Sequence, residues 1–329
     1  TRPALGLRPR LGIPPVIAYN RYREKRRPPV KNRALVFIKP HAITDKTISF
    51  VEEFLGQHRI QLSEARRINA AQISKQGIVD RHYFAIAGTA VFSTPEEYEL
   101  GEGAKSKFAD AFGIGWDAAV EKGKILNSVD AQERLGNISG IELNELWKQA
   151  QQTKLAPGLY AGYFAEQDFY VINGFYPGQR EVFTSEGAEV VLYEAEFDPA
   201  QVSWEQFRGQ IIGATDPAKA EEGSLRNLLL ERYTELGQTA KPEMSRNGVH
   251  ASAGPLEGLR ERMVWLGTKL RKSPLAAALL ERGMSRERLD ELLENPVVQL
   301  DGQTGPVFDL TEDIDADAAV EKLSELIAD

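Results

Sequence analysis

Residues 34–38 are the stretch that most restricts how this chain can fold. Ala34-Leu35-Val36-Phe37-Ile38 is a continuous apolar run, and Lys39-Pro40 follows it at once. An uninterrupted apolar run of this length is typical of a buried central β-strand. The proline ends the strand because it cannot donate a ladder hydrogen bond. The sequence therefore predicts a sheet built around residues 34–38, with Lys39 where the central strand ends.

Other patterns along the chain predict an α+β fold. Thr44 or Asp45 caps a helix that runs to about His58, because both residue types accept hydrogen bonds at helix N-termini. Residues 188–197 predict a strand, since they are rich in β-branched and aromatic residues. The other elements expected are a strand around 60–68 and helices at 73–83, 202–212, 224–236 and about 256–266.

Three segments lie outside this predicted core. Residues 84–174 contain helical patterns and few strand signals, so this segment is expected to be a mainly helical insertion. Residues 269–329 contain two amphipathic patterns, near 285–294 and 316–327. The predicted organisation is a basic N-terminal arm (1–33), a split core (34–83 and 175–268), the mainly helical insertion (84–174) and a C-terminal helical extension (269–329).

The N-terminal arm and the rest of the chain carry opposite charge. Residues 1–33 hold ten Lys or Arg against one Glu, a net charge of +9, while the remaining 30 basic and 47 acidic residues give −17. The arm's prolines and charges oppose regular, buried structure. We expect the protein's own acidic body to hold the arm. RNA, anionic lipid or an acidic protein in a larger assembly are the alternatives.

Composition excludes several classes of function. The chain has no cysteine, which rules out disulfides, thiolate metal sites and cysteine catalysis. No apolar run reaches the roughly 18 residues that a membrane-spanning helix needs. The sequence begins at Thr1 without a methionine, so we expect that a targeting peptide has been removed. The expected location is an organelle, the mitochondrion first and the plastid as the alternative.

His250 is the candidate catalytic residue. It lies between Asn247 and Ser252, and Glu261 follows on a predicted helix. A neutral imidazole can act as a nucleophile and accept a phosphoryl group, provided that its other nitrogen is held by a hydrogen bond. Ser252 or Glu261 could hold that nitrogen if the chain turns after Ser252, and residues 253–255 (Ala-Gly-Pro) permit such a turn.

Cationic and hydroxyl side chains lie at the ends of other predicted elements. Lys39 ends the central strand, Thr215 lies in the loop after Gly213, and Arg226 follows that loop. Arg208 lies on the helix before the loop. Phosphoryl transfer needs such donors around the phosphates, so these four residues are predicted to bind phosphate.

Together these residues give the chain a resemblance to the nucleoside diphosphate kinase family, as a divergent member with a large insertion and terminal extensions. The family's Asn-x-x-His-(Gly/Ala)-Ser signature matches 247–252, and its Gly-x-Thr-x-Pro-Ala loop matches 213–218. The other matches are Ile38-Lys39-Pro40, His82-Tyr83, Phe175-Tyr176-Pro177-Gly178, Arg226, Glu261 and Trp265.

The resemblance implies a ferredoxin-like fold, a four-stranded antiparallel sheet with helices on one face. It implies a ping-pong reaction in which a nucleoside triphosphate gives its γ-phosphoryl group to His250 and a nucleoside diphosphate then takes it. Mg²⁺ would arrive on the nucleotide phosphates, so no protein metal site is implied. The implied roles are His250 as nucleophile, Glu261 as its orienting partner, Lys39, Tyr83, Thr215 and Arg226 near the phosphates or the histidine, Asn247 at the sugar and Phe175 stacked on the base.

The sequence also departs from the family pattern. His41 and Ala253 stand where the family usually has aspartate, and Gly209 stands where its first phosphate-binding arginine is expected, one place after Arg208. Tyr163 is an alternative to Tyr83, because the insertion separates Tyr83 from the rest of the core.

These departures concern both the oligomeric state and the function. The loop before Asn247 is longer than in the family, which argues against the family's usual hexamer. A homo-oligomer of another size is the alternative. The alternative function is a nucleotide-binding or non-catalytic structural subunit of a larger organellar complex.

Overall fold

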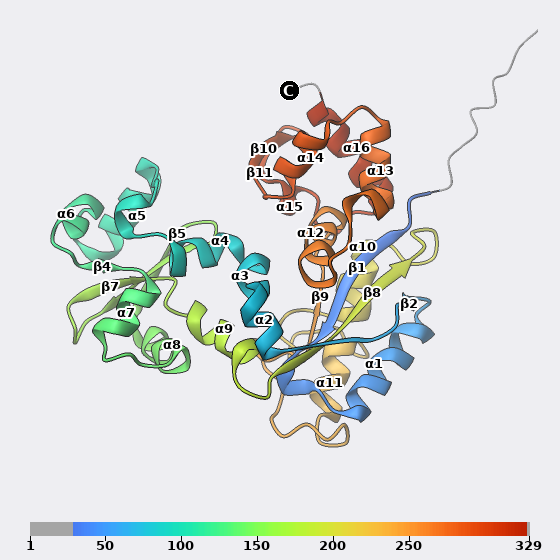
Figure 1. Ribbon diagram of the computed structural model, residues 1–329, viewed down its shortest axis with the longest axis horizontal. Coiled ribbons are helices and arrows are strands. Elements are labelled where there is room, and N and C mark those ends of the chain that lie inside the picture. The colour runs from blue at the N-terminus through green and yellow to red at the C-terminus, as the bar shows by residue number, and fades with distance from the viewer. Residues whose placement is uncertain (1–28, 328–329) are drawn as a thin grey trace, which may run out of the picture.

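The computed structural model describes residues 29–327 (Figure 1). We refer to 29–83 and 175–268 as the core, to 84–174 as the insertion and to 269–327 as the C-terminal extension. The strands of the core are β1 (Asn32–Ile38), β2 (Gln61–Leu62), β3 (Arg66–Asn69), β8 (Glu189–Phe197) and β9 (Val249–Ala251). Its helices are α1 (Asp45–Gln57), α2 (Ala70–Gln76), α3 (Ile78–His82), α9 (Tyr176–Thr184), α10 (Trp204–Gln206), α11 (Leu225–Arg232) and α12 (Pro255–Leu266), with short turns η1 (Pro40–Ala42) and η4 (Phe207–Ile212).

The core sheet is antiparallel throughout. Its strand order is β2-β8-β1-β9, and β3 also pairs with β8. β2 and β3 pair with different parts of β8, so the single strand predicted around 60–68 is an edge strand broken in two. The predicted strands at 34–38 and 188–197 are confirmed, as is the α+β fold class.

Helices cover both faces of the core sheet. Ala34, Val36 and Ile38 pack in one hydrophobic cluster with α1, η4 and α11. Leu35 and Phe37 pack in another cluster with α2, α3 and α12. All five side chains are fully buried, which is why the run is continuously apolar instead of alternating. The expectation of helices on one face is therefore wrong.

A glycine divides the helix predicted at 73–83. Gly77 has a φ of +57°, in the left-handed region that favours glycine, and it ends α2. The helix α3 begins at the next residue. The change of direction brings His82 and Tyr83, which end α3, to the base of the insertion.

The insertion contains a sheet of its own. Its strands β4 (Ile125–Leu126), β5 (Gln151–Ala156), β6 (Leu159–Phe164) and β7 (Phe169–Ile172) lie in the order β4-β7-β6-β5. Its helices are α4 (Phe84–Ala87), α5 (Glu102–Phe112), α6 (Trp116–Glu121), α7 (Ser128–Arg134) and α8 (Gly140–Gln149), with turns η2 (Gly88–Phe92) and η3 (Pro95–Glu97). The prediction of a mainly helical insertion missed this sheet, because the β5 sequence is mostly polar and exposed.

Two glycines allow α8 to pack closely against α9. A Cβ added at Gly140 would lie 2.4 Å from the carbonyl carbon of Pro177, and one added at Gly178 would lie 2.8 Å from the Cβ of Asn144. In addition, the backbone N–H of Ile141 donates to Glu181 Oε2 at 3.1 Å. The position of α8 is thus fixed by α9, a helix of the core.

The C-terminal extension packs on the last helix of the core. Its elements are η5 (Leu270–Lys272), α13 (Pro274–Glu281), α14 (Arg286–Leu292), β10 (Val297–Leu300), β11 (Gln303–Pro306), α15 (Val307–Leu310), α16 (Ala316–Leu323) and η6 (Ser324–Ile327). Leu256 and Leu259 of α12 belong to its hydrophobic cluster. Both predicted amphipathic helices are present, as α14 and α16. None of the helices between residues 29 and 327 has the length and apolar character needed to cross a membrane.

The end of the predicted arm is tied to acidic groups of the body. The backbone N–H of Val30 donates to Asp317 Oδ1 at 3.0 Å. Lys31 and Arg33 both form ion pairs of 2.7 Å with Glu196. The strand β1 already begins at Asn32, so the boundary predicted at 33 falls inside the strand. The rest of the arm, residues 1–28, lies outside the described residues, and its binding partner stays a prediction.

We expect Gly140→Ala to lower the free energy of unfolding by ~1–3 kcal/mol, because the added methyl group would overlap the backbone of Pro177. Urea denaturation measures the change. Gly103→Ala in α5 is the matched control, since nothing lies within 4 Å of the added carbon and alanine favours helix. Equal stability of the two variants would contradict the packing described for α8.

Candidate functional site

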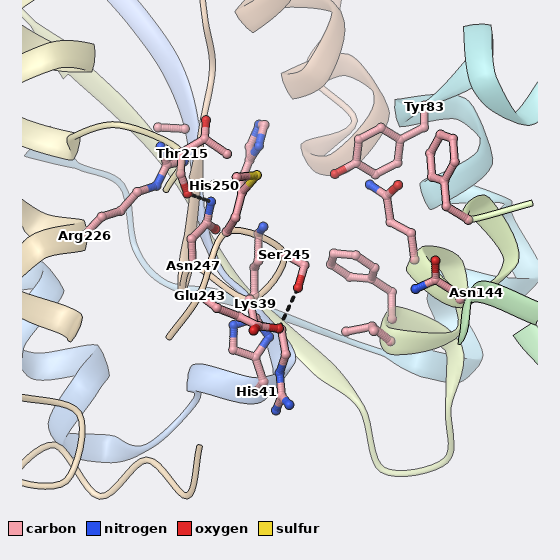
Figure 2. A pocket seen from close by; sticks show the side chains of 18 of the residues that line it. Lys39, His41, Tyr83, Asn144, Thr215, Arg226, Glu243, Ser245, Asn247 and His250 are labelled. Atoms are coloured by element: carbon pink, nitrogen blue, oxygen red, sulfur yellow. Dashed lines mark hydrogen bonds between the residues drawn. The ribbon is translucent and has the colours of Figure 1, made fainter. Parts of the chain in front are cut away.

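A cavity of about 920 Å³ lies between the core and the insertion (Figure 2). Most of the predicted site residues line it, namely Lys39, Tyr83, Phe175, Arg208, Thr215, Arg226, Asn247 and His250. The other two, Ser252 and Glu261, belong to a hydrogen-bonded group with His250. The fold thus brings together all ten residues from segments that are far apart in the sequence.

The central strands of the core position His250. It lies in β9 opposite Phe37 of β1, and its ring stacks on Phe37 with centroids 4.6 Å apart and planes at 22°. Ser252 Oγ accepts a hydrogen bond of 2.8 Å from the backbone N–H of Leu35, which ties the end of β9 to β1. The His250 side chain is 19% exposed, so the imidazole is held by the sheet but is accessible from the cavity.

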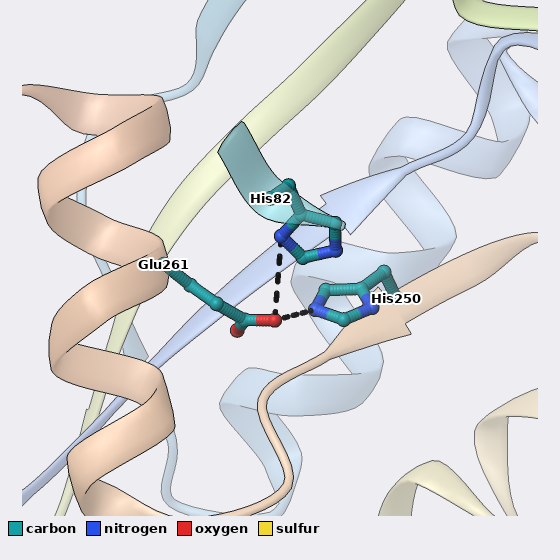
Figure 3. Close-up of side chains that lie close together, drawn as sticks. All are labelled: His82, His250 and Glu261. Atoms are coloured by element: carbon teal, nitrogen blue, oxygen red, sulfur yellow. Dashed lines mark hydrogen bonds and ion pairs between the residues drawn. The ribbon is translucent and has the colours of Figure 1, made fainter. Parts of the chain in front are cut away.

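Glu261 determines which nitrogen of His250 is available (Figure 3). Its Oε1 lies 2.7 Å from His250 Nε2, and its Oε2 accepts a hydrogen bond of 2.5 Å from Ser252 Oγ. A carboxylate only accepts, so Nε2 carries the hydrogen and a neutral His250 has its lone pair on Nδ1. No hydrogen-bond partner of Nδ1 is found among residues 29–327. Nδ1 is therefore the nitrogen that a ligand can reach.

The charge state of Glu261 supports this assignment. Burial acts to raise the pKa of its carboxyl group, but the charge and the hydrogen bond of His250, with smaller contributions from His82 and Ser252, bring the pKa below its ordinary value. The lowered pKa favours the carboxylate form of Glu261. Hydrogen bonds to an ionised acceptor are stronger than neutral ones, so the orientation of His250 is firmly held.

His82 is a site residue that the sequence indicated only as part of a motif. Its side chain is 4% exposed, and its Nδ1 lies 3.6 Å from Glu261 Oε1. Its ring meets the ring of His250 edge to face, with centroids 4.9 Å apart. Burial, the largest cause, lowers the pKa of His82 to about 3. His82 is therefore a neutral residue that packs behind the Glu261–His250 pair.

These three side chains also have the residue types of a metal site. His82 Nδ1, His250 Nε2 and Glu261 Oε1 lie within 4.8 Å of one another. Two ligands of a tetrahedral zinc ion, each ~2.0–2.1 Å from the metal, would be roughly 3.3 Å apart. The 2.7 Å between His250 Nε2 and Glu261 Oε1 fits a shared hydrogen better than a shared ion. We therefore infer that these side chains serve to orient His250 and do not form a metal site.

Two largely buried cations line the cavity with His250, and neither has an acidic partner among residues 29–327. Burial and the charge of Arg226 lower the pKa of Lys39 to about 8. Arg226 donates to the carbonyls of Gly213 and Val249, at 2.8 and 3.1 Å, and burial followed by the charge of Arg208 lowers its pKa to about 10. Neither cation forms an ion pair with a carboxylate in the described part of the chain. Because buried, unpaired charge costs free energy, the side of the cavity that contains Lys39 and Arg226 favours an anionic ligand.

The loops that contain Thr215 and Asn247 are joined at the cavity. Asn247 Nδ2 donates to the carbonyl of Thr215 at 3.0 Å, and the backbone N–H of Gly248 donates to His41 Nε2 at 3.2 Å. Burial and the charge of Lys39 lower the pKa of His41 to about 4, so it is a neutral acceptor. His41, where the resembled family has aspartate, thus serves to hold the loop that leads to His250.

Arg208 lines the cavity but is already paired. Its Nη1 forms ion pairs with Glu312 and, at 3.2 Å, with Asp313. Both carboxylates belong to the C-terminal extension, which the sequence did not connect with the site. To bind phosphate as predicted, Arg208 would have to exchange these carboxylates for the ligand.

Two aromatic residues connect the cavity with the insertion. Tyr83 lines the cavity, and burial raises the pKa of its hydroxyl to about 12. The alternative, Tyr163, lies on β6, where it donates to Asp168 Oδ1 at 3.0 Å, and it is not among the residues that line the cavity. Phe175 packs against Trp147 and Tyr160, each with centroids 5.7 Å away. Its orientation therefore depends on the insertion.

Glu257 is a cavity residue that was not predicted. It lies one helical turn before Glu261 on α12 and accepts a hydrogen bond of 3.2 Å from the backbone N–H of Ala253. Burial, then the charge of Glu261, raises the pKa of its carboxyl group to about 8. Ala253 cannot supply a carboxyl group, but Glu257 places one beside it.

No protein-family model matches the sequence, and no curated protein matches it. Solved structures of nucleoside diphosphate kinases resemble the chain weakly. The enzyme from Encephalitozoon cuniculi has 14% identity and a TM-score of 0.34, with 72% of this chain and 90% of that chain covered. The Pyrobaculum aerophilum enzyme has 15% identity and a TM-score of 0.35, with 74% and 98% covered. Similarity this low does not place the chain in that family.

We expect the protein to lose stability in acid through His82. Its folded-state pKa of about 3 lies below the ordinary value of 6.5, so below pH 6.5 the unfolded chain binds a proton that the folded chain does not. By linkage, this histidine lowers the free energy of unfolding by about 2 kcal/mol at pH 5. Urea denaturation of the wild type and of His82→Gln between pH 7 and 5 measures this change in the free energy of unfolding. The other titratable groups are the same in both proteins, so their contributions largely cancel in the difference. Parallel pH curves would contradict the burial of neutral His82.

Proposed function

We propose that the chain is a phosphotransferase of the nucleoside diphosphate kinase type, which moves the γ-phosphoryl group of a nucleoside triphosphate to a nucleoside diphosphate through a phosphohistidine at His250. One observation carries the proposal. His250 lines a cavity that also contains Lys39 and Arg226, and among residues 29–327 neither His250 Nδ1 nor these two cations has a carboxylate partner. A nucleophile beside unsatisfied positive charge is what phosphoryl transfer requires.

The binding step uses the anionic character of the substrate. The phosphates would neutralise Lys39 and Arg226, and this removes the cost of burying their charges. The hydroxyl of Thr215 would add a donor. Asn247, whose buried Oδ1 lacks a partner in the described part of the protein, would contact the sugar, and the ring of Phe175 would contact the base.

The transfer step is a displacement at phosphorus. His250 Nδ1 attacks the γ-phosphorus, a nitrogen–phosphorus bond forms, and the bond from phosphorus to the bridging oxygen breaks. The nucleoside diphosphate leaves with that electron pair. The imidazole ring becomes positively charged because Nε2 keeps its hydrogen, and the ionised Glu261 stabilises this charge. In the second half, a terminal oxygen of the acceptor diphosphate attacks the same phosphorus and the nitrogen–phosphorus bond breaks.

Magnesium would be held mainly by the substrate. Glu257 is the carboxyl group near Ala253 that could approach the ion, but its raised pKa of about 8 means that it is largely protonated at neutral pH. A protonated carboxyl group is a poor ligand for Mg²⁺, which prefers oxygen anions. Bound Mg²⁺ would neutralise charge on the phosphate oxygens.

A nucleotide-binding subunit without turnover is the second candidate function. The observation that favours it is the occupied state of Arg208, whose guanidinium is paired with Glu312 and Asp313. Such a protein would bind nucleotides at Lys39 and Arg226 but would not accumulate a phosphohistidine.

Incubation with γ-³²P-labelled nucleoside triphosphate separates the two candidates. A kinase gives a labelled protein that is labile to acid and stable to base, and His250→Ala abolishes the label because the nucleophile is missing. His58→Gln is the control, since His58 lies at the end of α1, where its Nδ1 lies 2.8 Å from the carbonyl of Phe54. Nucleotide binding without label on the wild-type protein would reject the kinase and support the second candidate.

A further inference from the structure

One face of α8 forms a wall of the cavity. Ile141, Asn144, Glu145 and Lys148 all line it, and their spacing of three, four and seven residues places them on the same side of the helix. α8 belongs to the insertion, so a segment outside the core contributes to the site. Figure 2 shows Asn144 on the side of the cavity opposite Thr215, Arg226 and Asn247.

This wall is rigid with respect to the core. The close approach at Gly140 and Gly178 leaves no room for a side chain between α8 and α9. The Cβ of Asn144 is itself one of the atoms in that contact. Ser139 also caps α8 with a capping box, formed with Glu142. Side chains on a fixed helix can read a ligand's shape and hydrogen bonds with little entropy cost.

Apolar side chains border the same part of the cavity. Ile141 is 49% exposed and Met244 is 58% exposed, although both are large and apolar. Met244 lies in the loop before Asn247 and Ile141 in the insertion, so both belong to segments that lengthen the chain relative to the resembled family. With Phe175, these side chains offer apolar surfaces for a flat aromatic group.

The position of the phosphates decides which group reaches α8. If the phosphates bind Lys39, Arg226 and His250, as the proposed function requires, the other end of the nucleotide extends away from them. The polar groups that α8 contributes there are the carboxamide of Asn144 and the Glu145–Lys148 ion pair, in which Lys148 Nζ lies 2.7 Å from Glu145 Oε1. This inference rests on the proposed function and specifies its substrate.

We propose that α8 is a nucleobase-recognition wall and that it favours guanine. Guanine has adjacent donors, N1–H and the N2 amino group, which suit the carboxylate of Glu145. It also has two acceptors, O6 and N7, which suit the ammonium of Lys148 and the amide N–H groups of Asn144. Adenine would place its N1 acceptor against a carboxylate, and the pyrimidines lack N7. One good pair of such bonds discriminates against the wrong base by roughly 5- to 150-fold in affinity.

The test is equilibrium binding of GDP, ADP, CDP and UDP to the full chain. We expect GDP to bind about tenfold more tightly than each of the others, which corresponds to one such pair of bonds. Glu145→Gln and Asn144→Ala should each reduce this ratio to within about threefold. Gln149→Ala is the control, because Gln149 is exposed at the end of α8 and does not line the cavity. Circular dichroism establishes that each variant is folded.

Labelling with the four γ-³²P triphosphates separates failure of this inference from failure of the proposed function. Equal binding of the four diphosphates, a preference for another base, or a GDP preference that survives both substitutions would overturn the role of α8. In each of those cases a phosphohistidine at His250 would still support the kinase. Absence of label from every triphosphate would instead reject the kinase, whatever the binding preference.

Discussion

The hydrogen bond between Glu261 and His250 Nε2 is the interaction on which the site depends. It assigns the hydrogen to Nε2, leaves the lone pair on Nδ1 and places a negative charge where the imidazole would become positive. Several parts of the fold serve to maintain it. Ser252 holds the second oxygen of Glu261, Phe37 supports the ring of His250, and neutral His82 fills the space behind both. The apolar central strands and α12 therefore do more than form a core, because they set this geometry.

The rest of the cavity is arranged around unbalanced charge. In the part of the chain that the structure describes, Lys39 and Arg226 have no carboxylate partner, whereas Arg208 is paired with Glu312 and Asp313 of the C-terminal extension. An anionic ligand would satisfy the first two at once and would compete with the acidic pair for the third. The C-terminal extension is thus coupled to the site by charge, and the insertion is coupled to it through α8 and Phe175.

The sequence predicted the parts of the molecule that depend on local pattern. The apolar run at 34–38, the strand at 188–197 and the spacing from His250 to Glu261 were sufficient to locate the central strands and to single out His250 as the candidate nucleophile. The sheet of the insertion was missed because the exposed, polar β5 has no apolar periodicity. Contacts such as the pairing of Arg208 with Glu312, 104 residues away, leave no local signal. The burial of His82 and the approach of α8 to the cavity likewise arise only from tertiary packing.

The role of the Glu261–His250 hydrogen bond can be tested by locating the phosphoryl group on the imidazole ring. The protein would be phosphorylated with nucleoside triphosphate, denatured in base, in which phosphohistidine is stable, and examined by NMR to distinguish the two isomers. Because Glu261 holds Nε2–H, we expect phosphorylation on Nδ1 of His250. A phosphoryl group on Nε2 would show that the Glu261–His250 hydrogen bond does not direct the chemistry.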